Sequence, residues 1–220
     1  MGIKMKPLDI SALLKNLIKP MDPLPTNIRP KGLLTETPLA LIFDIYGAQL
    51  LKKIEFTSTH DKLTGLKNRA AIDLKLAEEI KLARRYKRPF SILLLDIDHF
   101  KQVNDQHGHH AGDEALRAVG DLLRRHVRET DTPGRFGGEE FIILAPTTGG
   151  PSSVILAERI LSEFRKATVP IDDKGGTISI TASIGIASIS DTVNDADQLL
   201  KSVDQALYTA KSRGRDRFCI

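Results

Sequence analysis

The spacing of apolar residues along the chain has two periods, which separate helices from strands. Apolar residues recur every three or four positions, as in amphipathic helices, over residues 39–57, 68–88, 112–129, 152–168 and 196–214. Short apolar runs predict strands at residues 90–97, 134–136, 140–145 and 178–189. The first run is continuously apolar, which is typical of a strand buried on both faces. Gly137 and Gly138 separate the second strand from the third. We expect a hairpin there because glycines accept the positive φ angles of a two-residue turn.

From residue 67 onward the order is helix, strand, helix, strand, strand, helix, strand, helix. This order predicts an α/β protein of the α+β kind, with one mixed central sheet flanked by helices. Before it, a short helix over residues 10–19 precedes four prolines that exclude regular structure, at positions 20, 23, 25 and 30. The helix over residues 39–57 carries an apolar stripe, which packs either on its own domain or on a second copy of the same helix. The stripe consists of Phe43, Tyr46, Leu50 and Ile54.

Composition narrows the class of protein only slightly. Hydrophobic residues make up 41% and charged residues 27%, which is typical of a soluble globular chain. The net charge of +4 suits small anionic ligands but is too weak and dispersed to indicate nucleic acid. The single Cys219 cannot form an internal disulfide, the start of the chain lacks the apolar core of a signal peptide, and residues 39–51 are too short to span a bilayer. We therefore expect a cytoplasmic protein with no membrane span.

Carboxylates stand where two of the predicted strands begin or end. Asp96 and Asp98 close the first strand, and Glu139 and Glu140 follow the two glycines. In a mixed sheet these positions can converge, and converging carboxylates raise one another's pKa unless a cation is bound. Oxygen ligands without His or Cys suit Mg²⁺, which fills its coordination shell with substrate phosphates. Because the glycines let a phosphate or ribose approach the backbone, the residue types predict metal-dependent phosphoryl or nucleotidyl transfer.

Plainer interpretations of the same residues remain open. An aspartate after the first strand could cap the next helix, and the two glycines could form only a tight turn before a solvated strand end. Lys211 and Arg215, at i and i+4, could be solvated charges, and Arg128 and Asp131 could form an ordinary ion pair at a helix end. The histidines at 107, 109 and 110 lack a Cys or fourth ligand nearby, which argues against a zinc site.

Several segments together resemble the GGDEF family, the diguanylate cyclases. "GGEEF" at 137–141 is similar to the family hallmark in its Glu variant, and "HDKLTGLKNR" at 60–69 to the motif D-x-LTGLxNR. "DIDHFKQVNDQHGHHAGDEAL" at 96–116 resembles the substrate-binding segment, and "TASIGIA" and "ALYTAKSRGRDR" the late strand and last helix. The resemblance covers residues 58–220 as the cyclase domain. Residues 1–57 remain as an N-terminal helical extension, which we expect to serve dimerisation or signal input. Lys67 stands where proline is usual, and Asp216 where Asn is frequent.

The resemblance implies a palm-like fold of the nucleotide-cyclase, ferredoxin-like kind, and condensation of two GTP into cyclic di-GMP with release of two pyrophosphates. It implies two Mg²⁺ ions, for which Mn²⁺ can substitute, held by Asp96, the Ile97 carbonyl, Glu139 and Glu140. Glu139 corresponds to the proposed base for the ribose 3′-hydroxyl, and Lys101 fits a catalytic cation at the phosphates. The implied GTP-binding residues are Phe100, Asn104, His109, Asp113, Gly137, Gly138, Lys211 and Arg215.

Two of these residues correspond to the guanine readers of the family. A carboxylate at Asp113 can accept from guanine N1–H and the 2-amino group, and the Asn104 amide can serve N3 or O6. Relatives that make mixed GMP–AMP products have Ser at the position of Asp113. We therefore expect GTP as both substrates.

The resemblance also implies control and assembly. In the family an R-x-x-D motif, here Arg128 to Asp131, forms a site at which bound product inhibits the enzyme. An arginine that matches Arg159 contributes to this site. Each domain binds one GTP, so a homodimer is required.

Two other hypotheses are a catalytically silent module that senses cyclic di-GMP or GTP, and a palm-type nucleotidyltransferase without the cyclic product. The first is disfavoured because the Gly-Gly pair and the carboxylates are intact, and the second by Asp113 and Arg128.

Overall fold

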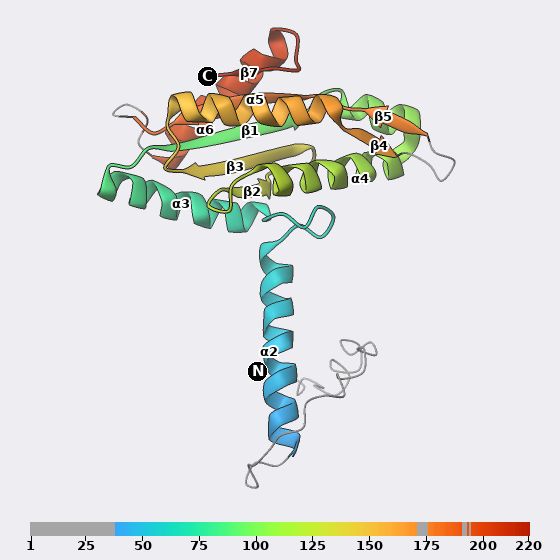
Figure 1. Ribbon diagram of the computed structural model, residues 1–220, viewed down its shortest axis with the longest axis vertical. Helices are drawn as coiled ribbons and strands as arrows, with labels where there is room; N and C mark the ends of the chain where they lie inside the picture. The colour runs from blue at the N-terminus through green and yellow to red at the C-terminus, as the bar shows by residue number, and fades with distance from the viewer. Residues whose placement is uncertain (1–37, 171–175, 191–192, 194) are drawn as a thin grey trace, which may run out of the picture. The chain divides into compact units, whose positions relative to one another are not determined.

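A computed structural model describes residues 38–170, 176–190, 193 and 195–220, with only the backbone at residues 38–46, 48 and 50 (Figure 1). The chain divides into two units, residues 1–48 and 49–220. The boundary that we predicted at residues 57 and 58 stays a prediction. The predicted helix over residues 10–19 and the proline-rich segment lie outside the described residues, as do the side chains of Phe43, Tyr46 and Leu50. In the described part of the chain no helix has both the length and the apolar character needed to cross a membrane.

The helices and strands expected from residue 39 onward are present in the described residues, with additions and with one expected strand divided in two. The helices are α2 (Pro38–Thr59), α3 (Arg69–Tyr86), α4 (Phe100–His126), α5 (Gly150–Lys166) and α6 (Ala196–Ser212). The strands are β1 (Phe90–Ile97), β2 (Thr132–Arg135), β3 (Glu140–Pro146), β4 (Thr168–Pro170), β5 (Thr177–Ser179), β6 (Ala182–Ser188) and β7 (Phe218–Cys219). Five strands form one mixed sheet in the order β2-β3-β1-β6-β7, in which only β6 and β7 run parallel. The predicted fold class is thereby confirmed.

The central strand β1 explains how helices cover both faces of the sheet. Every residue of β1 is buried, and successive side chains point to opposite faces. Leu93, Leu95 and Ile97 belong to a core with residues of α4 and α5. Ile92 and Leu94 belong to a second core with residues of α3 and α6. The sheet therefore lies between two helical layers (Figure 1), and the continuous apolar run in the sequence reflects this burial.

Two glycines shape the helices that carry candidate residues. Gly108 lies inside α4 but adopts φ 82° and ψ 164°, which are not helical angles, so α4 has a kink there. Gly214 adopts φ 110° directly after α6, and the Arg215 N–H returns to the Ala210 carbonyl at 3.1 Å. A positive φ at this point ends the helix, since only glycine adopts it without strain.

Two sequence predictions about strands were wrong in detail. The strand expected at 178–189 is interrupted after Ser179, because β5 pairs with β4 in a separate two-stranded sheet while β6 joins the main sheet. The hairpin between β2 and β3 exists, but Gly137 and Gly138 do not have positive φ angles. The connection is longer than two residues, and the Phe136 and Gly137 N–H groups both donate to the Glu140 carbonyl, at 2.8 and 3.2 Å.

The segment that leads into α3 covers the outer edge of the sheet. The Lys67 carbonyl accepts a hydrogen bond from the Arg135 N–H at 2.8 Å, and the Lys67 N–H donates to the Pro133 carbonyl at 3.4 Å. Both Arg135 and Pro133 lie on β2, the last strand on this side. The chain therefore pairs with the β2 edge before Asn68 caps the first turn of α3.

Candidate active site

The predicted metal ligands converge at one end of β1 and β3. Asp96 lies opposite Glu140 in the antiparallel register, and the Ile97 N–H donates to the Glu139 carbonyl at 3.3 Å. The Lys211 Nζ lies 2.7 Å from the Asp96 Oδ2, so α6 contributes a cation to the same place. The strand pairing thus brings together residues that are more than forty positions apart in the sequence.

The electrostatics of this cluster are unfavourable for three negative charges. Burial raises the pKa of Asp96 above its ordinary value despite the opposing effect of Lys211 and Arg215. Burial and the charge of Asp96 raise the pKa of Glu139, and the same two causes raise the pKa of Glu140. The carboxylates are therefore held where they repel one another, and a cation would stabilise their charged forms.

These residues fit Mg²⁺ by their chemistry. Within the described residues no three His, Cys, Asp or Glu side chains are arranged to hold a metal ion by themselves. Mg²⁺ needs only one or two protein carboxylates when substrate phosphates and water complete its shell. The donors at this end of the sheet are all oxygens, and Lys211 is the neighbour that neutralises Asp96. Oxygen donors with raised pKa values are compatible with a hard divalent ion bound together with a nucleotide.

The turn between β2 and β3 is held by two arginines that sequence reasoning did not assign. The Arg135 Nη2 donates to the Gly138 carbonyl at 2.7 Å, and its Nη1 lies 3.3 Å from the Asp61 carboxylate. The Arg69 guanidinium stacks on the Phe136 ring at 3.4 Å from its centroid. Asp61 and Arg69 both belong to the "HDKLTGLKNR" motif. The motif was visible in the sequence, but its contact with the glycine turn depends on the tertiary structure.

The absence of a side chain at Gly137 has a specific reason. A Cβ at this position would lie 2.5 Å from the Glu140 Oε2, whereas a Cβ at Gly138 would have no heavy atom within 4 Å. Gly137 therefore makes room for the Glu140 carboxylate itself. Gly138 is exposed and leaves the backbone accessible from solvent, as the sequence suggested for an approaching nucleotide.

Asp98 is a structural anchor. Its carboxylate accepts hydrogen bonds from Thr181 Oγ1 and Ser183 Oγ, each at 2.7 Å, and from the Asp216 N–H at 3.1 Å. The cap of α4 is instead His99, which makes no side-chain capping bond. Asp98 therefore ties the end of β1 to β6 and to the loop after α6.

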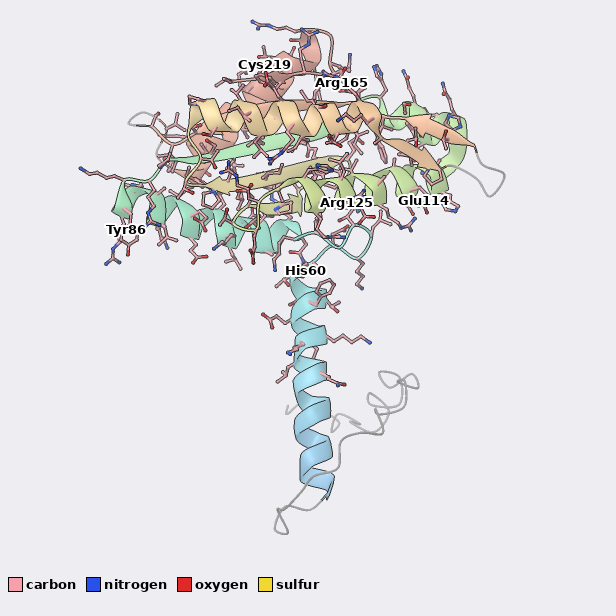
Figure 2. The ribbon with its side chains drawn as sticks, viewed as in Figure 1. His60, Tyr86, Glu114, Arg125, Arg165 and Cys219 are labelled. Carbon is pink, nitrogen blue, oxygen red and sulfur yellow. The ribbon has the colours of Figure 1, made fainter. Side chains whose placement is uncertain are left out.

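Arg215 lies in that loop and not on α6. Lys211 and Arg215 do not share a helix face, because α6 ends at Ser212 and Arg215 has a φ of 61°. Arg165 on α5 binds the carboxylate of Asp216 at 2.9 Å, from the position labelled in Figure 2. The charge of Arg215 nevertheless opposes the rise that burial causes in the pKa of Asp96, so it acts on the carboxylate cluster.

The remaining candidates from the nucleotide-binding segment lie on α4. Lys101, His109 and Asp113 are exposed, and Asn104 is half-buried. The Phe100 side chain is 8% exposed and belongs to the core, so only its backbone is available to a nucleotide. His107, His109 and His110 are exposed around the kink at Gly108 and, within the described residues, form no metal-binding group. The structure thus offers no support for zinc at these histidines.

The R-x-x-D residues lie in the turn between α4 and β2. The Asp131 Oδ2 accepts from the Arg128 backbone N–H at 3.0 Å, so the contact between the two residues runs through the backbone of Arg128. The other oxygen, Oδ1, is buried without a hydrogen-bond partner in the described structure. Burial raises the pKa of Asp131, while the guanidinium groups of Arg128 and of Arg159 on α5 lower it. Asp131 therefore holds the turn through the Arg128 backbone, while the guanidinium groups of Arg128 and Arg159 act on its carboxylate through their charge.

The mixed sheet, with carboxylates at the ends of β1 and β3 and a cation from α6, has the arrangement that the sequence motifs imply for a palm-like domain. Residues 58–217 match the family model "Diguanylate cyclase, GGDEF domain". The chain belongs to the GGDEF diguanylate cyclase family.

Named relatives and solved structures agree with this membership. The chain is 44% identical over 160 residues to the diguanylate cyclase DgcP of Pseudomonas aeruginosa, a match that covers 71% of this chain and 23% of the relative. It is 34% identical over 170 residues to the probable diguanylate cyclase DgcC of Escherichia coli, covering 77% of this chain and 45% of the relative. The chain thus spans less than half the length of these relatives.

Among solved structures, the GGDEF domain of DgcB from Caulobacter crescentus in complex with c-di-GMP has a TM-score of 0.70 at 31% identity, over 73% of this chain and 94% of that one. The active GGEEF domain of a diguanylate cyclase from Vibrio cholerae has a TM-score of 0.64 at 35% identity, over 70% and 96%. Both similarities concern the domain described above, which confirms the family and fold expected from the motifs.

Proposed function

We propose that this chain is an active, Mg²⁺-dependent diguanylate cyclase that condenses two GTP molecules into cyclic di-GMP and releases two pyrophosphates. The observation that carries the proposal is the convergence of Asp96, Glu139 and Glu140 with Lys211 at the ends of β1 and β3. Family members whose glycines and carboxylates are lost would lack this cluster. Here all of these residues are present and the turn that holds them is braced by Arg135.

The residues of the chain have distinct proposed roles. Asp96, the Ile97 carbonyl, Glu139 and Glu140 would hold two Mg²⁺ ions, or Mn²⁺ in their place, against the triphosphate. When bound, the metal would polarise the α-phosphate and offset the charge of the leaving pyrophosphate. Lys101, Lys211 and Arg215 would supply cations to the phosphates.

Glu139 would accept the proton of the 3′-hydroxyl, whose oxygen forms the new bond to the α-phosphorus as the bond to pyrophosphate breaks. Two such transfers close the ring. Asn104 and Asp113 would recognise the guanine, and the backbone around Phe100, Gly137 and Gly138 would lie close to the nucleotide, with His109 as a further contact.

Incubation of the protein with GTP and Mg²⁺, followed by mass spectrometry, tests this function. We expect cyclic di-GMP and pyrophosphate, formed at a rate that rises more steeply than protein concentration, and neither product after the metal is chelated. A linear dinucleotide would indicate a transferase without ring closure. Bound GTP that stays unchanged at high protein concentration would contradict catalysis and favour the sensor hypothesis.

We propose that Arg128, Asp131 and Arg159 bind the product. Arginines bind phosphates through two parallel hydrogen bonds and stack on purines, which matches the phosphates and the bases of a dinucleotide. The Asp131 carboxylate already holds the turn through the Arg128 backbone, so the Arg128 guanidinium is not needed for that contact. The guanidinium is therefore available to a guanine dinucleotide.

Replacing Arg128 by alanine is therefore expected to weaken inhibition by added cyclic di-GMP about tenfold or more, since charge-assisted hydrogen bonds are lost. The initial rate without added product should change little, as Arg128 lies outside the carboxylate cluster. Initial rates over a series of product concentrations measure the effect. Arg125→Ala, at the exposed arginine labelled in Figure 2, is the control and should keep normal inhibition. Unchanged inhibition in Arg128→Ala would contradict product binding at this site.

We propose that a homodimer is the active form, because each domain would bind one GTP. The α2 helix is the candidate dimer element, and its exposed Leu51, Ile54 and Phe56 support this role. A protein lacking residues 1–57 is expected to sediment as a monomer and to lose most of its cyclase rate at low concentration. Analytical ultracentrifugation beside the full chain measures this, and a dimer of unchanged strength would rule out α2 as the contact.

A further inference from the structure

The kink in α4 brings two distant residues of that helix into contact. Asn104 precedes the kink at Gly108 by four residues, and Gly112 follows it by four. In a straight helix, eight residues span about 12 Å along the axis, so their side chains would not meet. Here a Cβ added to Gly112 would overlap the Asn104 Oδ1 and lie 3.0 Å from its Cγ. The Asn104 amide therefore lies in the space that Gly112 leaves.

The space beside Gly112 is shared with the ring of Phe100. The same Cβ at Gly112 would lie 3.2 Å from the Cζ of Phe100, whose ring is buried in the core. Gly112 is itself buried, whereas Asp113 beside it is exposed. The half-buried Asn104 amide and the Phe100 ring thus both border Gly112, the residue directly before the second proposed guanine reader, Asp113.

Gly112 has no conformational reason to be glycine. Its φ angle is not positive, and it lies within the second half of α4, where alanine is the better helix former by about 1 kcal/mol. The atom that a Cβ would overlap is the end of a flexible side chain, so the fold can adjust by moving Asn104. The requirement for glycine at this position therefore concerns where the amide lies and not whether the helix forms.

We propose that Gly112 is a specificity-determining position: by having no side chain, it fixes the Asn104 amide where it can recognise the guanine of the substrate. This inference rests on the proposed function. Gly112 does not touch the nucleotide but positions the residue that does. A larger residue at 112 displaces the amide from the base while the carboxylates of β1 and β3 stay in place.

The substitution Gly112→Ala tests the proposal. We expect KM for GTP to rise about tenfold, as for the loss of one or two hydrogen bonds, with kcat at saturating GTP changed less than about twofold. Calorimetry with Mg²⁺ and guanosine 5′-(α,β-methylene)triphosphate, which cannot release pyrophosphate, should show the same loss of affinity. The ratio between the affinities for this analogue and for the corresponding adenosine compound should become smaller. The melting temperature should change little, because alanine favours the helix while its Cβ comes within 3.2 Å of the Phe100 ring.

A double-mutant cycle separates this role from a general effect on folding. In the Asn104→Ala background, adding Gly112→Ala should cause no further loss of affinity, because the side chain it displaces is already absent. Equal losses in both backgrounds would overturn the proposal, as would unchanged KM and base preference in the single variant. Gly150→Ala, where a Cβ would meet nothing within 4 Å, is the matched control. If the wild type binds the analogue but makes no cyclic di-GMP, the proposed cyclase function is wrong. The calorimetric affinities of the variants would still decide whether Gly112 positions Asn104.

Discussion

Replacing Glu139 by glutamine is expected to reduce the rate of cyclic di-GMP formation by about 10²–10⁴-fold, the range that a positioned general base contributes. Glutamine keeps the volume and the backbone of the turn but can neither accept the 3′-hydroxyl proton nor carry charge to a metal ion. Product formation under excess GTP and Mg²⁺, followed by mass spectrometry, measures the loss.

Folding of this variant should be unimpaired. Burial and the charge of Asp96 raise the pKa of Glu139, so removing its charge relieves repulsion in the cluster. We expect a melting temperature equal to or above that of the wild type. Glu78→Gln, which changes a side chain 58% exposed on α3, is the charge-matched control and should keep full activity. An activity within about tenfold of the wild type in Glu139→Gln would exclude Glu139 as the base.

Gly185→Ala is expected to destabilise the domain by about 3 kcal/mol, at the upper end for overpacking a core. Gly185 lies on β6 where α6 crosses the sheet, and its added Cβ would overlap the Val203 carbonyl oxygen and lie 2.5 Å from the Leu207 nitrogen. These are backbone atoms of one helix, so no side-chain rotation can remove the clash. For a chain of this size the melting temperature should fall by about 10 °C, as measured by thermal unfolding.

The cyclase rate distinguishes Gly185→Ala from Gly112→Ala, for which kcat is expected to change little. Displacement of α6 in Gly185→Ala would also move Lys211, so the cyclase rate should fall together with stability. Gly150→Ala again provides the matched substitution and should alter neither quantity. A stable Gly185→Ala protein would show that α6 can move away from the sheet at little cost.

Local sequence patterns were sufficient where burial alone decides the structure. The apolar run at residues 90–97 predicted the central strand because both faces of β1 are covered by helices. The convergence of these carboxylates was also expected from the sequence, and the antiparallel register of β1 and β3 places Asp96 opposite Glu140.

Residues whose role depends on distant partners were not predictable. Asp61 and Arg135 are separated by 74 positions, and their contact exists only because the segment before α3 pairs with β2. The last helix ends at Ser212, two residues before its predicted end, because Gly214, Arg215 and Asp216 adopt positive φ angles. The Gly137–Gly138 pair was located correctly, but the reason for glycine at 137 is the space taken by the Glu140 carboxylate, which no local pattern reveals.

The segment around Lys67 has a further consequence for the protein at high concentration. A sheet whose outer strand has free N–H and C=O groups can anneal with strands of other molecules and aggregate. On one side of this sheet Lys67 occupies groups of β2, which also contains Pro133, and on the other side β7 has only two residues. Neither border of the main sheet, as far as the structure describes it, is a long unprotected strand. Either border therefore offers little backbone for pairing with a strand of another molecule.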